Sequence, residues 1–99
     1  MITEFVLTDH ARKRMAQRNV SEVDILFILQ HGHVTHCAGT IMVACRHKDI
    51  PEERLILDQF RRLDGVSIVM NRLEPLVITV WRNRKRGSRH IRRKRKNGR

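Results

Sequence analysis

The positive charge of this 99-residue chain is confined to its C-terminal end, and this limits which part of it can fold. Residues 82–99 contain 11 Lys or Arg side chains and no Asp or Glu. Residues 1–81 hold 10 basic and 10 acidic side chains and are formally neutral. The end segment has one large apolar residue, Ile91, so it cannot bury enough surface to offset the entropy lost on folding. We therefore predict a folded domain over residues 1–82 and a disordered polybasic tail over residues 83–99.

A polycationic tail attracts a polyanion, and nucleic acid is the most common partner of this kind. An acidic protein on which the tail folds is the alternative partner. We expect no membrane partner, because Ile91 is the only large apolar side chain that the tail could insert into lipid. The cations expected to contact nucleic acid are Arg84, Lys85, Arg86, Arg89, Arg92, Arg93, Lys94, Arg95 and Lys96.

The size and composition of the chain predict a cytoplasmic protein without a cofactor. No stretch approaches the roughly 20 apolar residues that a membrane span needs. The first residues, M-I-T-E-F-V-L-T-D, carry an early acid and lack the apolar run of a secretory signal. Two cysteines, Cys37 and Cys45, suit a reducing compartment. About 80 foldable residues allow one domain with a modest core and little room for a deep cofactor cavity.

The N-terminal third of the chain carries signals for an extended segment and a first helix. Residues 2–7 are short, apolar and β-branched, as in a strand or an extended lead-in. Thr8 or Asp9 can cap a helix over residues 10–18, and Asn19 is a suitable residue to end it.

A second helix is predicted to begin at Ser21, with Asp24 as its capping-box partner. Its run V-D-I-L-F-I-L ends at His31 and Gly32, where glycine can adopt the left-handed conformation of a C-cap. This helix is the most apolar segment of the chain and is expected to form one side of the core.

After Gly32 the sequence pattern changes to that of short strands. Turns are indicated at Ala38-Gly39, Asp64-Gly65 and Glu74-Pro75. The order of elements predicts an α+β fold, in which two N-terminal helices pack on one face of an antiparallel sheet. We expect the second helix to pack beside Val69 and Ile78 of that sheet. The strands are expected over residues 34–37, 40–46, 55–60, 66–70 and 76–81.

The first helix holds the residues most suited to chemistry. His10, Arg14 and Arg18 are spaced i, i+4, i+8 and therefore lie on one face of the helix. Two arginines can bind phosphate oxygens, and a histidine can exchange a proton near neutral pH. The same spacing is also found on the ordinary solvent face of an amphipathic helix, and the spacing alone does not separate the two interpretations.

Residues 7–25, LTDHARKRMAQRNVSEVDI, resemble the opening of a bacterial domain-of-unknown-function family. That family has a helix of the form His-Ala-x-x-Arg-Met-x-x-Arg followed by a short helix that begins at serine. The end of its last strand is similar to VITVWR at residues 77–82. The resemblance implies the fold of the RelE/ParE toxins, which is similar to that of small metal-independent ribonucleases. It further implies that the site is lined by His10, Arg14, Arg18 and Thr79.

The activity implied by the resemblance is RNA cleavage through attack of the 2′-hydroxyl. His10 would serve as base or acid. Arg14, Arg18 and Arg82 would stabilise the negative charge of the crowded phosphorane. RNA is therefore the expected partner rather than DNA, together with a cognate antitoxin. A second proton carrier is not evident in the sequence. The alternatives are a noncatalytic nucleic-acid-binding module and a partner-binding domain whose tail engages an acidic protein.

A second group of reactive residues surrounds the end of the second helix. His31, His33, His36 and Cys37 resemble a metal site in composition, and Cys45 could add a ligand from across the hairpin. On a strand, however, His33 and His36 point to opposite faces, whereas zinc needs four converging ligands. We therefore expect no metal at this cluster.

Overall fold

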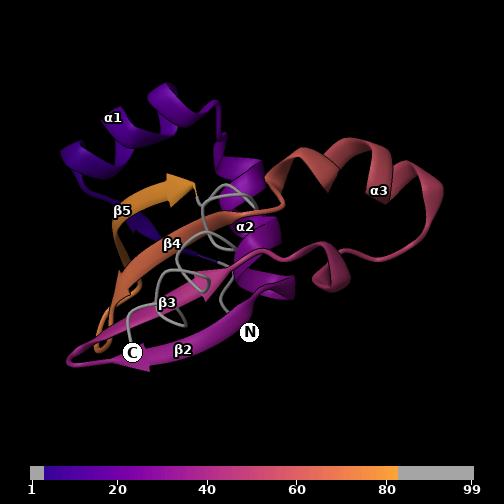
Figure 1. The fold of residues 1–99 in the computed structure, drawn as a ribbon. Helices are drawn as coiled ribbons and strands as arrows, with labels where there is room; N and C mark the ends of the chain where they lie inside the picture. Colours follow the sequence, from indigo (N-terminus) through magenta and orange to yellow (C-terminus); the bar gives the residue numbers. More distant parts are fainter. Residues whose placement is uncertain (1–3, 83–99) are drawn as a thin grey trace, which may run out of the picture.

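The computed structural model describes residues 4–82, which form an α+β domain with three α-helices and a five-stranded mixed sheet (Figure 1). The predicted tail, residues 83–99, lies outside the described residues, and the expectations for its cations stay predictions. None of the described helices is long and apolar enough to cross a bilayer. The elements are β1 (Val6–Leu7), α1 (Asp9–Arg18), α2 (Glu22–His31), β2 (His33–Cys37), β3 (Thr40–Ala44), the 3-10 turn η1 (His47–Asp49), α3 (Arg54–Phe60), the 3-10 turn η2 (Arg61–Leu63), β4 (Val66–Asn71) and β5 (Leu76–Arg82).

Helix α1 begins and ends where its sequence indicates. The Thr8 hydroxyl accepts a hydrogen bond from the Ala11 N–H at 3.0 Å, as an N-cap residue does. Asn19 follows the helix in the left-handed region, with φ of 56°, and its N–H donates to carbonyls of the last turn. The helix predicted over residues 10–18 is confirmed, with one further residue, Asp9, at its start.

Helix α2 begins and ends at the predicted residues, but its C-cap has a different conformation. The Ser21 hydroxyl accepts from the Asp24 N–H at 3.2 Å, and the Asp24 carboxylate accepts from the Ser21 N–H at 2.9 Å. Gly32 ends the helix with φ of −71°, so the predicted left-handed cap is wrong. Its role is steric, because a Cβ at Gly32 would lie 2.6 Å from both the Ile28 carbonyl oxygen and Val43 Cγ1.

The strands are ordered β1-β5-β4-β3-β2 across the sheet. All neighbouring pairs are antiparallel except β1 and β5, which run parallel with Val6 opposite Leu76. The expectation of a purely antiparallel sheet is therefore wrong at this edge. Strand direction could not be predicted here, because β1 has only two residues and the whole domain separates it from β5. The predicted β2–β3 hairpin is confirmed, with φ of 27° at Ala38 and 86° at Gly39.

Residues 55–60 do not form the predicted strand but lie within helix α3. A short apolar run of this length does not distinguish a strand from a buried helical turn. In the helix, Phe60 stacks on Phe27 of α2, with ring centroids 3.9 Å apart and an angle of 6° between the rings. This aromatic contact to another element, which the local sequence does not encode, helps to hold the helical alternative in place.

The hydrophobic core lies between the helices and one face of the sheet. Val69 and Ile78, the predicted packing partners of α2, are half-buried and are not the core positions. Val69 pairs with Thr79, whereas the neighbouring pair of Ile68 and Val80 faces the core, and the β4–β5 register shifts after Val69. Val66, Ile68 and Met70 alternate with Ser67, Val69 and Asn71, so the pattern of β4 itself favours the buried face, and the expectation for Val69 missed this alternation. Core side chains include Ile25 and Ile28 from α2 and Val43, Ile68, Met70, Val77 and Val80 from the sheet.

Candidate nucleic-acid interface

Two stripes of side chains run next to each other along α1. Ala11 and Met15 form the buried stripe, which belongs to the core. His10, Arg14 and Arg18 form the second stripe, here called the basic stripe; His10 is exposed and the two arginines are half-buried. Each residue turns the helix by about 100°, so Arg18 lies nearest to the buried stripe and His10 furthest from it. The basic stripe therefore borders the core and is not the solvent face opposite to it.

Hydrogen bonds join the first two members of the basic stripe. Arg14 Nε donates to His10 Nε2 at 3.4 Å, and Arg14 Nη1 donates to Gln17 Oε1 at 2.9 Å. In this arrangement His10 Nε2 is the acceptor, and the contact orients the imidazole toward the Arg14 guanidinium. Gln17 was not among the predicted site residues, although its i, i+3 spacing from Arg14 is a sequence signal for such a contact.

The N-terminal end of α1 is fixed to strand β5. The Thr8 hydroxyl donates to the Ile78 carbonyl at 2.9 Å, and the Thr8 N–H donates to the Val77 carbonyl at 3.1 Å. The same hydroxyl accepts the capping bond from Ala11. One threonine therefore ends the β1–β5 ladder, caps α1 and places His10 beside the start of β5.

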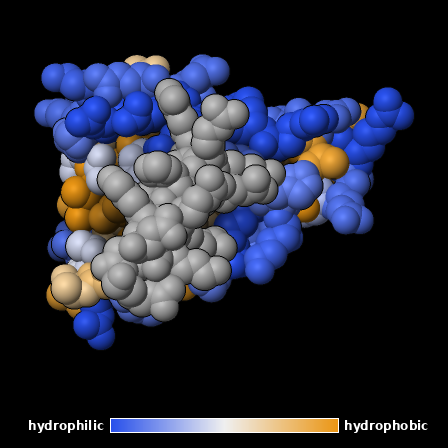
Figure 2. All heavy atoms as spheres, in the orientation of Figure 1, coloured by the Kyte–Doolittle hydropathy of each residue, from blue (hydrophilic) through white to orange (hydrophobic). Residues whose placement is uncertain are grey.

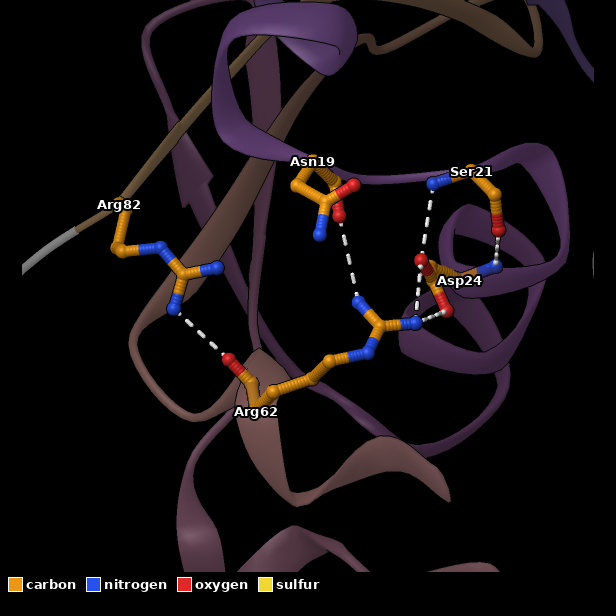
Figure 3. A network of polar contacts seen from close by, with 5 residues as sticks. All are labelled: Asn19, Ser21, Asp24, Arg62 and Arg82. Atoms are coloured by element: carbon orange, nitrogen blue, oxygen red, sulfur yellow. Dashed lines mark hydrogen bonds and ion pairs between the residues drawn. The ribbon is translucent and has the colours of Figure 1, made fainter.

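The C-terminal end of α1 is fixed to the other end of β5 through a polar junction (Figure 3). Arg62 donates to both carboxylate oxygens of Asp24, at 2.8 and 2.9 Å, and to the Asn19 carbonyl at 3.3 Å. Arg82 in turn donates to the Arg62 carbonyl at 2.8 Å. The junction, formed by Asn19, Ser21, Asp24, Arg62 and Arg82, therefore ties α1, α2, η2 and β5 together.

The Asp24–Arg62 ion pair within this junction is a structural contact. The Asp24 side chain is 2% exposed, and its two oxygens accept from Arg62 and from the Ser21 N–H. A buried carboxylate needs such partners, because its charge has lost its water. Asp24 was predicted only as a capping residue, and its partner lies 38 residues further along the chain. No local sequence signal points to this pairing.

The hydrogen bonds of Thr8 at one end and the polar junction at the other are here called the two anchors of α1. They make α1 run beside β5 in the same direction (Figure 1). Thr8 lies at the Ile78 end of the strand, and Asn19 lies at the Arg82 end. With a rise of 1.5 Å per residue, about 14 Å of helix axis separates His10 from Asn19. The basic stripe thus follows the seam between α1 and β5, here called the α1–β5 seam.

Arg18 has a donor that finds no acceptor within residues 4–82. Its Nε is buried, and no described atom accepts a hydrogen bond from it. Most buried donors in proteins are paired, because an unsatisfied one costs about 1 to 3 kcal/mol. The half-buried position of Arg18 beside the core stripe explains why the nitrogen is covered. An anion oxygen that reached it would supply the missing acceptor.

The five predicted catalytic residues do not surround a single point. His10 and Arg14 are in contact, and Arg18 follows one turn further along α1. Thr79 lies on β5 between the two anchors, half-buried and opposite Val69 on the sheet face turned away from the core. Arg82 lies at the far end of the seam, where the Arg62 carbonyl holds it. The arrangement suits an extended anion with several phosphates better than one isolated phosphate.

The cluster of histidines near β2 is dispersed in the fold. His31 lies against the Phe27 ring, with centroids 4.5 Å apart, at the end of α2. His33 pairs with Ala44 and His36 pairs with Ile41, so the two take opposite faces of β2 as predicted. Within residues 4–82, no three His, Cys, Asp or Glu side chains are grouped closely enough to hold a metal ion.

The two cysteines differ in environment. Cys37 is exposed at the hairpin, whereas Cys45 is buried in the core. Burial, with smaller contributions from Asp49 and Asp64, raises the pKa of the Cys45 thiol to about 12. A thiol with such a pKa stays protonated and is a poor nucleophile or metal ligand. Cys45 is therefore a packing residue and not the additional metal ligand that its position across the hairpin suggested.

Hydrophilic side chains cover α1, in the upper left of the space-filling view (Figure 2). Four of its ten residues are Arg or Lys, and Asp9 is its one acid. Of the ion pairs formed by the described residues, none involves a cation of α1. This helix therefore presents positive charge that no carboxylate of the described domain neutralises by direct contact.

The fold and site define a small α+β domain whose first helix, beside the last strand, carries cations that form no ion pair within residues 4–82. Comparison with protein families places it more closely. The chain belongs to the family described as Domain of unknown function (DUF4258), which matches residues 7–82. The match contains both α1 and the end of β5. Searches of curated proteins and of solved structures gave no match.

Proposed function

We propose that this domain is RelE/ParE-like and that it binds and cleaves RNA as a toxin-type, metal-independent ribonuclease. The RNA strand lies along the α1–β5 seam, and the bond that is cleaved lies beside His10. The polybasic tail, outside the described residues, adds electrostatic attraction for the phosphate backbone. A cognate antitoxin is the proposed protein partner.

The basic stripe is the observation that carries this proposal. It combines a histidine, an arginine that donates to its Nε2 and a second arginine whose buried Nε lacks an acceptor within the described domain. Arginine presents several N–H groups in a plane, which matches the oxygens of a phosphate. A run of such groups next to a proton acceptor is the arrangement that phosphodiester cleavage needs.

The proposed reaction uses the 2′-hydroxyl of the RNA as nucleophile. His10 Nε2 takes the proton of that hydroxyl while the 2′ oxygen attacks phosphorus. The bond from phosphorus to the 5′ oxygen breaks, leaving a 2′,3′-cyclic phosphate, and the 5′ oxygen takes a proton from solvent. Arg14 must leave His10 Nε2 for this step, and a phosphate oxygen is the acceptor that draws it away. RNA binding and activation of the base are thereby coupled.

The other predicted residues take positions along the bound RNA. Arg18 binds a phosphate oxygen through the exposed part of its guanidinium. Thr79 lies on β5 between the two ends of the seam. Arg82 is held by the Arg62 carbonyl at the end away from His10, so we assign it to a neighbouring phosphate and not to the reacting one. Its main contribution is to the position of β5.

A noncatalytic RNA-binding module is the second candidate, and one observation favours it. Within residues 4–82, the only hydrogen bond of the His10 side chain is the one from Arg14, and no second acid or base joins it. In this alternative the tail and the basic stripe form a binding platform. A tail that binds an acidic protein is a third possibility, for which residues 4–82 offer no observation.

Incubation of the full chain with labelled RNA, in the presence of a chelator, separates these candidates. His10→Ala should lower the cleavage rate by about 10² to 10⁴, the usual contribution of a positioned acid or base, and change binding little. Lys13→Ala is the matched control, because Lys13 is exposed on the same helix outside the basic stripe. RNA that is bound but not cut by wild type or His10→Ala would decide for the noncatalytic module.

A further inference from the structure

The two edges of the sheet are protected very differently. β1, at one edge, has two residues, whereas β2, at the other, has five residues that are all exposed. Edge strands usually carry charge, proline or a bulge, which prevent pairing with another chain. β2 reads H-V-T-H-C and has no Lys, Arg or proline, and it pairs with β3 without a register shift. It is therefore an edge that can accept a further strand.

An apolar groove lies beside this edge on the core-facing side of the sheet. It has a volume of about 310 Å³, and its apolar wall includes Leu29, Val34, Ile41, Val43, Met70 and Leu73. Val34 of β2 is 48% exposed, although it pairs with the buried Val43. A strand added beyond β2 would cover Val34 and extend the wall of the groove.

The turn of the hairpin fixes which backbone groups face outward. A two-residue turn with positive φ at both positions makes the closing pair, Cys37 and Thr40, hydrogen-bonded. Hydrogen-bonded and non-bonded pairs alternate, so Val34 and His36 direct their N–H and C=O groups away from β3. Thr35 lies midway between them. The outward groups are thus symmetric about Thr35.

We propose that β2 pairs antiparallel with β2 of a second copy of this chain, with Thr35 on the two-fold axis. Val34 then lies opposite His36 of the second copy, and His36 lies opposite its Val34. Both pairs can exchange two hydrogen bonds, because all the groups involved face outward. The two five-stranded sheets join into one continuous sheet, and the two grooves meet at the new contact.

The charges around this edge favour a second copy as the occupant. β2 has no permanent charge, so two copies of it do not repel each other across the contact. The rim of the groove holds one cation, Arg72, and one anion, Glu74. A rim with one charge of each sign is complementary to its own copy in a two-fold contact, where the same surface meets itself. A strongly acidic partner would find no such match here.

This contact leaves the α1–β5 seam free. β5 lies near the opposite edge of the sheet, with β4 and β3 between it and β2. The dimer would therefore carry two copies of the basic stripe, facing outward at its two ends. The inference does not depend on the proposed RNA cleavage, and each can fail without the other.

Disulfide trapping tests the proposed register in the full chain. Facing residues in a non-hydrogen-bonded pair have Cα atoms about 4.5 Å apart, which lies within the range of about 4.4 to 6.8 Å for disulfides. In a Cys37→Ala background, Thr35→Cys should form a covalent dimer under mild oxidation. Cys45 does not interfere, because it is buried and its pKa is raised to about 12.

Thr40→Cys in the same background is the matched control, because it lies on β3, away from the two-fold axis. Equal trapping of the two variants would indicate random collision and overturn the register. Sedimentation of the chain without added cysteines should show dimers that dissociate on dilution, and Val34→Lys, which charges the edge, should be monomeric at the same concentration. A wild-type chain that stays monomeric at high concentration would overturn the proposal, as would Val34→Lys that dimerises equally well.

Discussion

Arg62 and the arginines of the basic stripe show the same side chain in two different states. The Arg62 guanidinium bonds both oxygens of a carboxylate that is 2% exposed, and it joins η2 and the end of α1 to α2. Arg14 and Arg18 form no ion pair within the described residues, and Arg18 Nε lacks any acceptor there. The first arginine holds the fold together, whereas the other two contact no carboxylate within residues 4–82, and in our proposal they bind the phosphates of RNA.

This difference shows that formal charge is a poor guide to the electrostatic surface. Residues 1–81 have equal numbers of acidic and basic side chains. Three of the acids, Asp24, Asp49 and Asp58, form ion pairs with arginines outside α1. The cations of α1 have no such partner among the residues that the structure describes. A neutral domain can therefore present a basic helix when its acids are used elsewhere in the fold.

The largest expected effect comes from the tail, whose cations have no acid in their own segment. Deleting residues 83–99 removes ten Lys or Arg side chains. Each phosphate contact on a single strand contributes about 0.7 to the slope of log affinity against log salt. RNA titrations between about 50 and 200 mM salt should show a slope several units smaller. The remaining slope measures the share of the basic stripe, and an unchanged slope would show that the tail is not the electrostatic anchor.

The second effect concerns stability, and it tests the structural role of Arg62. Arg62→Ala leaves the Asp24 carboxylate buried without its charged partner, which typically costs 3 to 5 kcal/mol. Because the Arg62 side chain is 45% exposed, water can reach part of the site, and we expect about 3 kcal/mol in urea unfolding. Arg61→Ala, at the neighbouring exposed residue, should change stability by less than about 0.5 kcal/mol. Equal losses of unfolding free energy in the two variants would contradict the structural role of Arg62.

The stripe arginines should show the reverse pattern. Arg14→Gln and Arg18→Gln keep much of the aliphatic stem, so the free energy of unfolding should change little. RNA affinity should fall about tenfold or more for each, since a hydrogen bond to a charged group contributes about 1.5 to 3 kcal/mol. Arg12→Gln, on an exposed part of α1 outside the stripe, is the control. If all three variants lose affinity equally, the helix acts only through its net charge.

The smallest effect concerns a third arginine, Arg46, whose guanidinium bonds Asp49 at 2.8 Å. This contact holds the pKa of Asp49 below its ordinary value of 3.8. A lowered carboxyl pKa adds stability above the ordinary value, and that stability is lost as the pH falls through the pKa of the folded state. Urea unfolding should show Arg46→Met less stable than wild type at neutral pH, with the difference shrinking below about pH 3.8. A constant difference would mean that Arg46 acts through its stem alone.

Local signals predicted much of the N-terminal half. The caps at Thr8, Ser21 and Asn19 are formed within a few residues of the chain, so their sequence is sufficient to specify them. The Ala38-Gly39 hairpin is equally local. The same reasoning placed His10 next to Arg14, because residues four apart are neighbours on a helix. Within the candidate site, this contact is the part that the sequence could predict.

Contacts between distant segments decided the remainder. Residues 55–60 form a helix that stacks Phe60 on Phe27, and no pattern in the segment itself distinguishes that outcome from a strand. The register of β5 against β4 shifts between Val69 and Met70 and skips Ile78, so Val77 and Val80 are the core residues of β5, and no local pattern shows this irregularity. Arg82 was predicted as a charge stabiliser, and its bond to the Arg62 carbonyl, a contact across 20 residues of chain, places it at the end of the seam away from His10.

The sequence by itself determined where helices α1 and α2 begin, where the β2–β3 hairpin turns and which residues share the basic stripe. Each of these depends on interactions spanning four residues or fewer, whose geometry is the same in any fold. Only the tertiary structure decided which cations are neutralised. The pairing of Asp24 with Arg62 crosses 38 residues of chain. Because charges interact through space and not along the chain, only the fold shows that Arg14 and Arg18 form no ion pair within residues 4–82.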